Sequence, residues 1–196
     1  MRKVTRFVHR ILLFLIFTLC CNPSALSQSN DIALTGGGMF SFTNPLDLGA
    51  AWALEGTFAH RIAAPPLVSV YFELPVAGSF TSPIPKLSGV SIARSYTSLF
   101  VTPGLRLRLA PSFPLSPYFS VGIGYARFHD QLFNGNNRVS NSFAVDIGGG
   151  LDLHVLPFIG LRGEIRNFNS GGLDIPTLAL GRQNSLFATA GIVFRF

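Results

Sequence analysis

Charged side chains recur along this chain at alternate positions, mostly between apolar residues or glycines. Arg106 and Arg108, for example, alternate with Leu105, Leu107 and Leu109. Alternation of this kind places the charges on one face of a β-strand and the apolar residues on the other. The residues that share this pattern are Glu55, Glu73, Arg106, Arg108, Asp146, Asp152, His154, Arg162, Glu164, Arg166 and Arg195. Because the set contains acids and arginines, the chemistry that it favours is mutual ion pairing away from water.

Two other kinds of chemistry would use the same polar faces. A ring of arginines, among them Arg106, Arg108 and Arg166, would suit a narrow solute path with ion selectivity. Catalysis would need a serine activated by a histidine that a third group orients. His60, His129 and His154 show no such motif, and no Gly-x-Ser-x-Gly elbow occurs. We therefore assign no catalytic or cofactor-binding residue, and the chain is not expected to be an enzyme.

Metal binding is not expected either. Both cysteines, Cys20 and Cys21, lie near the amino terminus, and the histidines lack the spacing that metal ligands show. The glycine clusters 36–38 and 148–150, together with Gly122 and Gly124, are not followed by Lys-Ser/Thr, so they do not form a phosphate-binding loop. They are expected to leave room for bulky neighbours or for strand curvature.

The elements that must carry the polar faces are eight alternating segments. They cover residues 31–42, 48–60, 67–74, 96–109, 118–128, 142–155, 158–168 and 185–196. Most are close to the ~10 residues that a tilted membrane-spanning strand requires. Short links, at 62–66, 110–117 and around Pro157, alternate with longer ones at 43–47, 77–95, 130–141 and 169–184. This predicts an all-β, eight-stranded antiparallel up-and-down barrel with both termini on the periplasmic side and the longer links outside the cell.

A soluble β-sandwich is the alternative architecture. Charged residues make up only 12% of the chain and hydrophobic residues 48%, which is poor in charge for a water-exposed surface. In a sandwich the last segment would also be an unprotected edge strand, whereas closure of a barrel removes the edges. Both observations favour the membrane barrel.

The amino-terminal segment has the pattern of a secretory signal peptide. Arg2, Lys3, Arg6 and Arg10 precede the apolar run 11–19, and small residues stand two apart at Ala25 and Ser27. We expect residues 1–27 to be cleaved after export by the general secretory route. The run is too short for a transmembrane anchor, which needs about 18 apolar residues. A lipoprotein site at Cys20 is a lesser alternative, because Leu19 is large for that motif.

Loss of the signal changes the charge of the protein. Four of the 15 basic residues lie in residues 1–27 and none of the 9 acidic ones does, so the formal charge falls from +6 to +2. A nucleic-acid partner is therefore not expected.

The last segment, 185–196, places Ile192, Phe194 and Phe196 on one face and Arg195 on the other. This Gly-Ile-Val-Phe-Arg-Phe ending resembles the last strand of bacterial outer-membrane barrels, which their assembly machinery reads. Val101-Thr-Pro-Gly-Leu-Arg-Leu-Arg and Pro117-Tyr-Phe-Ser-Val-Gly-Ile-Gly-Tyr also resemble outer-membrane barrel domains. Over residues 30–196 the chain resembles the small eight-stranded barrels of the OmpA/OmpX type.

The resemblance implies a barrel domain over residues 28–196, located in the bacterial outer membrane. It implies contact with outer-membrane lipid and lipopolysaccharide, transient contact with the barrel assembly machinery and periplasmic chaperones, and a monomeric state. The expected role is structural or one of surface interaction, with an interior closed by ion pairs. A small-solute channel and a lipid-modifying enzyme remain the alternatives.

Overall fold

The computed structural model describes residues 28–42, 47–80, 86–87, 90–91, 95–131, 137–171, 174–175, 178–179 and 183–196. The predicted signal peptide, residues 1–27, lies outside the described residues. Within them, no helix combines the length and the apolar character that a membrane crossing requires.

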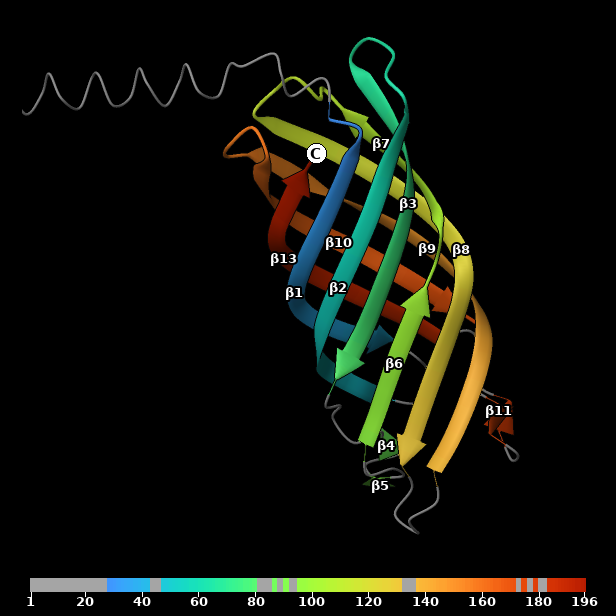
Figure 1. The fold of residues 1–196 in the computed structure, drawn as a ribbon. Coiled ribbons are helices and arrows are strands. Elements are labelled where there is room, and N and C mark those ends of the chain that lie inside the picture. The colour runs from blue at the N-terminus through green and yellow to red at the C-terminus, as the bar shows by residue number, and fades with distance from the viewer. Residues whose placement is uncertain are drawn as a thin grey trace, which may run out of the picture.

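Nine long strands build one closed antiparallel barrel (Figure 1). They are β1 (Asn30–Phe42), β2 (Asp47–Ala63), β3 (Val68–Phe80), β6 (Ser95–Val101), β7 (Gly104–Leu109), β8 (Leu115–Gln131), β9 (Asn137–His154), β10 (Ile159–Ser170) and β13 (Gln183–Arg195). β6 and β7 follow each other between β3 and β8, so the barrel has eight strand positions. β1 pairs with β13 as well as with β2, which closes the ring. The predicted all-β, eight-stranded antiparallel barrel is therefore confirmed.

A proline divides the predicted strand 96–109 into β6 and β7. Pro103 has no N–H group with which to continue the ladder, and Pro75 stands in the neighbouring strand β3. The backbone bridges the gap with hydrogen bonds from Thr102 N to Pro75 O at 3.4 Å and from Ile123 N to Pro103 O at 3.1 Å. Both halves keep the same neighbours, so the interruption leaves the barrel closed.

The two ends of the barrel differ in their connections. At the terminal end, where Asn30 and Arg195 lie, residues 64–67, 110–114 and 155–158 join consecutive strands. At the opposite loop end lie the short pairs β4 (Lys86–Leu87) with β5 (Val90–Ser91) and β11 (Asp174–Ile175) with β12 (Leu178–Ala179) (Figure 1). Links 77–95 and 110–117 were predicted too long, because β3 continues to Phe80 and β8 begins at Leu115.

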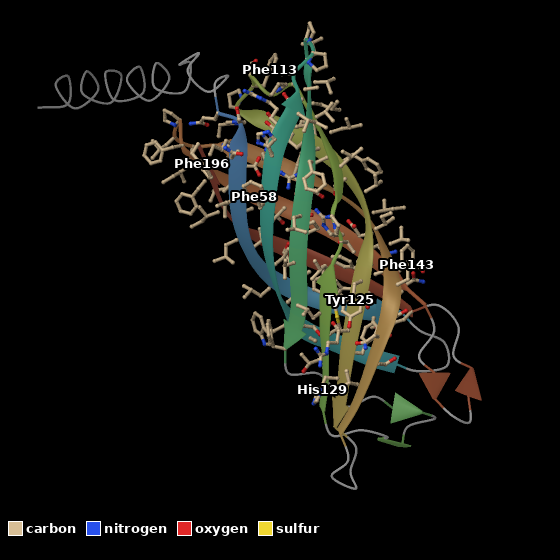
Figure 2. The ribbon with its side chains drawn as sticks, turned by 45° about the vertical axis from the view of Figure 1, so that its right-hand side comes forward. Phe58, Phe113, Tyr125, His129, Phe143 and Phe196 are labelled. Carbon is tan, nitrogen blue, oxygen red and sulfur yellow. The ribbon has the colours of Figure 1, made fainter. Side chains whose placement is uncertain are left out.

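The two faces of each strand have opposite character. The side chains of Leu105, Leu107 and Leu109 in β7 are exposed on the outside, whereas Arg106 and Arg108 are buried inside. Aromatic side chains on the outside gather toward both ends: Phe58, Phe113 and Phe196 lie near the terminal end, and Tyr125 and Phe143 lie nearer the loop end (Figure 2). This apolar exterior with aromatic residues toward its borders is typical of a barrel in a lipid bilayer.

Candidate functional site: the polar interior of the barrel

The centre of the interior is organised around Arg166 of β10. Its guanidinium group reaches carboxylates on three strands: Nη1 lies 2.5 Å from Asp146 Oδ2 and 3.0 Å from Glu73 Oε1, and Nε lies 3.3 Å from Glu55 Oε1. Nε also donates a hydrogen bond of 2.6 Å to Glu164 Oε1 on its own strand. All five side chains are nearly or fully buried. One arginine thus ties together four strand positions of the barrel, counting its own.

A second cluster lies closer to the terminal end. Asp31 of β1 accepts hydrogen bonds from Arg106 Nη1 at 3.1 Å and Arg108 Nη2 at 2.6 Å. Asp152 of β9 accepts a bidentate pair from Arg162, at 2.8 Å from Nε and 3.0 Å from Nη2. Arg108 Nη2 also lies 2.8 Å from Asp152 Oδ2 and therefore joins the two acids. Bidentate arginine–carboxylate geometry gives the strongest ion pairs of this kind.

Glu73 of β3 connects the two clusters. Its Oε2 accepts a hydrogen bond of 2.7 Å from Arg106 Nε, while its Oε1 accepts one of 3.0 Å from Arg166 Nη1. The interior charges therefore form one continuous network. Breaking it at one member leaves a buried charge without its partner.

Two tyrosines pack against the arginines. The Tyr118 ring packs against both Arg106 and Arg162, whose guanidinium carbons are 5.0 and 4.9 Å from its centroid. Its hydroxyl donates a hydrogen bond of 2.8 Å to Glu164 Oε2. Tyr71 lies under Arg108 at 4.6 Å and accepts a hydrogen bond of 2.8 Å from it. Cation–π contacts add to the ion pairs where water is excluded.

Glycines make the room that this network occupies. A Cβ atom on Gly150 would lie 2.7 Å from the Tyr118 hydroxyl oxygen and would also overlap the carbonyl oxygen of Gly163. A Cβ atom on Gly148 would lie 3.1 Å from Arg166 Cγ. One on Gly122 would overlap Asp146 Oδ1. The inward glycines thus leave space for bulky neighbours, the role that the sequence indicated.

Toward the loop end the interior changes from charged to apolar. Phe100, Phe128, Phe168 and Phe187 point inward and are almost completely buried. Phe100 stacks on Phe168 at 4.5 Å and meets Phe128 and Phe187 edge to face, each at 5.7 Å. Met39 and small alanines complete this apolar cluster. The lumen is therefore filled by ion pairs in one part and by aromatic rings in the other.

The structure brings ten of the eleven residues named from the sequence into this network: Glu55, Glu73, Arg106, Arg108, Asp146, Asp152, Arg162, Glu164, Arg166 and Arg195. His154 is only half-buried at the terminal end, where its Nδ1 lies 3.3 Å from the Pro114 carbonyl oxygen. Asp31 and Tyr118 were missed. Both stand at inward positions of the strand alternation, beside Ile32 and Phe119, so the same pattern could have found them.

The three histidines of the described barrel lie in different surroundings. His60 is outside the barrel at the terminal end, where its Nδ1 lies 2.8 Å from Asn30 Oδ1. His129 is exposed near the loop end (Figure 2). His154 faces the interior at the terminal end. In the described ranges, no three His, Cys, Asp or Glu side chains form a group that could hold a metal ion.

The chain resembles known proteins in its structure alone. No model of a protein family and no curated protein matches the chain. The Neisserial surface protein A crystal structure superposes with a TM-score of 0.63 at 13% identity, covering 85% of this chain and 97% of that one. The amino-terminal barrel domain of Pseudomonas aeruginosa OprF gives 0.55 at 14%, covering 86% and 98%.

A third similar structure is the attachment invasion locus protein Ail of Yersinia pestis in complex with the heparin analogue sucrose octasulfate. Its TM-score is 0.50 at 15% identity, and the match covers 85% of this chain and 99% of that one. Identities this low carry information on the fold and not on the ligand. The closed ring of eight strand positions and these three likenesses show that the chain has the fold of the small eight-stranded outer-membrane β-barrels.

Proposed function

We propose that this protein is an outer-membrane barrel with a structural or surface-interaction role and an interior closed to solute flow. The observation that carries the proposal is the filled lumen. Six carboxylates and five guanidinium groups are buried inside the described part of the barrel, and four phenylalanines follow them toward the loop end. A barrel of eight strands encloses only about the space that its own side chains fill.

The exterior supports the membrane location. Outward residues of the central strand segments, such as Leu107, Ile123, Ile147 and Ile165, are apolar and exposed. The exposed Arg127 and His129 lie on β8 beyond Tyr125, toward the loop end. Lipid and lipopolysaccharide are therefore the proposed surroundings of a monomeric barrel, with the loop end toward the cell exterior.

The test is a measurement of ion conductance. The protein purified from bacterial outer membranes should show no steady conductance in planar lipid bilayers, while its altered gel mobility before heating verifies the folded barrel. A double variant, Phe100→Ala with Phe168→Ala, removes two stacked rings and serves as the comparison for a widened interior.

Steady, ion-selective openings of the unaltered protein would overturn the closed-lumen proposal. In that event, neutral replacements of Arg106, Arg108 and Arg166 should change ion selectivity, as in a channel. In a closed barrel the same replacements should act on stability alone. The proposal assigns no turnover to the protein; hydrolysis of purified lipid A or phospholipid by the folded barrel would contradict it.

A further inference from the structure

A small cavity opens at the terminal end of the lumen, outside the ion-paired centre. Its volume is about 10 Å³, near the space that one ordered water molecule needs. The titratable side chains that face it are Asp31, Arg61, Tyr71, Arg108, His154 and Arg195. Three of these six are arginines and one is a carboxylate, so the cavity has an excess of positive charge.

Arg195 is the member of this group with the least compensation. Its side chain is only 5% exposed, yet Nε, Nη1 and Nη2 donate no hydrogen bond to any described residue. Among the described residues, its one close carboxylate oxygen is Asp152 Oδ2 at 3.5 Å, which is already held by Arg162 at 3.0 Å. A buried charged donor without acceptors costs free energy that a bound acceptor would recover.

The carboxylate that lines the cavity does not fill this need. Asp31 Oδ1 accepts from Arg106 and Oδ2 accepts from Arg108, so both oxygens point to other arginines. Arg108 Nε is also without a hydrogen-bond partner in the described residues. Two buried guanidinium groups at one cavity thus retain free N–H donors.

We propose that this cavity is a binding site for a small inorganic anion of halide size, with Arg195 and Arg108 as its principal donors. Chloride is a small anion of single charge, and the N–H groups of Arg195 and Arg108 that lack an acceptor in the described residues are the donors that it would engage. The site lies at the mouth of the barrel, so it is independent of whether the central lumen conducts.

The first test is chloride-35 NMR on the protein purified from membranes in detergent. The wild-type barrel should broaden the chloride line beyond the bulk value, and added bromide should remove this excess by competition. Arg195→Gln should abolish the excess broadening. Arg127→Gln is the matched control, because Arg127 is an exposed arginine on the outside of β8 and should leave the effect intact. Full broadening by Arg195→Gln, or none by the wild type, would overturn the proposal.

A second measurement decides the case without any variant, should Arg195→Gln fail to fold. Crystals of the wild-type protein soaked in sodium bromide should show an anomalous peak between the guanidinium groups of Arg108 and Arg195. An empty cavity at high bromide concentration would contradict the assignment. Bromide at scattered surface positions, with none in the cavity, would likewise indicate adventitious binding only.

Discussion

Arg166 forms more ion pairs than any other side chain of the described interior, because four carboxylates contact it. Replacing it by glutamine would leave Glu55, Asp146 and Glu164 without this cation, whereas Glu73 keeps its ion pair with Arg106. Removing one partner of a buried ion pair costs about 3–5 kcal/mol. We therefore expect Arg166→Gln to lower the free energy of unfolding by an amount in this range, measured by urea unfolding in phospholipid vesicles.

The control for this prediction is Arg127→Gln. It removes the same charge from an exposed position on the outside of β8, so the unfolding midpoint should stay close to that of the wild type. Equal stability of the two variants would mean that the buried network contributes nothing to folding.

A substitution at Gly150 tests the packing of the network without changing any charge. A methyl group there would lie 2.7 Å from the Tyr118 hydroxyl and would overlap the Gly163 carbonyl. Overpacking of this kind costs about 1–3 kcal/mol. Gly150→Ala should therefore destabilise the barrel in the same urea assay. Gly163→Ala is the matched control, because a Cβ atom there meets nothing within 4 Å. A comparable loss in both variants would contradict overpacking as the cause, because the lower entropy of the unfolded chain that alanine brings stabilises the fold at both positions.

At the scale of the elements, the alternation of apolar and polar residues was sufficient to predict every long strand position and which face of it is inside. The period of two decides both, because a shift by one residue would turn every charge toward lipid. The ends of the strands were less predictable. Leu115 and Pro117 belong to β8 although proline favours a turn. Pro117 lies near the start of the strand, outside the β7–β8 pairing that begins at Arg108 and Tyr118, where a missing N–H is tolerated.

Which acid pairs with which arginine could not be predicted from the sequence, for a different reason. Asp31 and Arg108 are 77 residues apart in the chain, and β1 and β7 are not neighbours in the barrel. Such pairs form across the lumen, where strand tilt and side-chain length decide which charges meet. The inward phenylalanines, such as Phe100 and Phe168, were missed because an aromatic residue fits both a membrane border and a filled interior.

A charged substitution on the outward face of β10 tests whether the strands are surrounded by lipid. Ile165 is exposed near the middle of this strand, between the aromatic residues of the two ends. An arginine at the bilayer midplane costs about 2–4 kcal/mol, and near the interface about 0–1 kcal/mol. Ile165→Arg should therefore destabilise the folded barrel in vesicles much more than Val139→Arg, because Val139 is paired with His129 toward the loop end. Equal effects of the two substitutions would argue against a bilayer around the strands.

For the molecule as a whole, closure depends on the seam between β1 and β13. The register runs from Asp31 opposite Arg195 to Phe42 opposite Asn184. Beyond it, Asn30 N donates to Phe196 O at 2.9 Å and Phe196 N donates to Asn30 O at 3.0 Å. The seam brings Asp31 to its arginines, so the interior network and the closed backbone ladder form together.

A substitution at Phe196 distinguishes an effect on the stability of the folded barrel from an effect on its assembly in the cell. Phe196→Ala keeps both backbone hydrogen bonds to Asn30 and removes only an outward ring. If Ile192, Phe194 and Phe196 form the signal that the assembly machinery reads, this variant should refold from urea into detergent as the wild type does. Its amount in the outer membrane of expressing cells should nevertheless fall severalfold, measured by quantitative immunoblotting of membrane fractions.

Phe158→Ala provides the comparison, because Phe158 is an exposed ring at the same end of the barrel but precedes β10. The Arg195 backbone N–H donates to the Phe158 carbonyl oxygen at 2.9 Å, so the two positions are also neighbours in the structure. Loss of a border aromatic residue alone should affect both variants equally. A selective loss of Phe196→Ala from the membrane would therefore assign recognition to the closing strand, since the two rings are similarly exposed at the same end of the barrel.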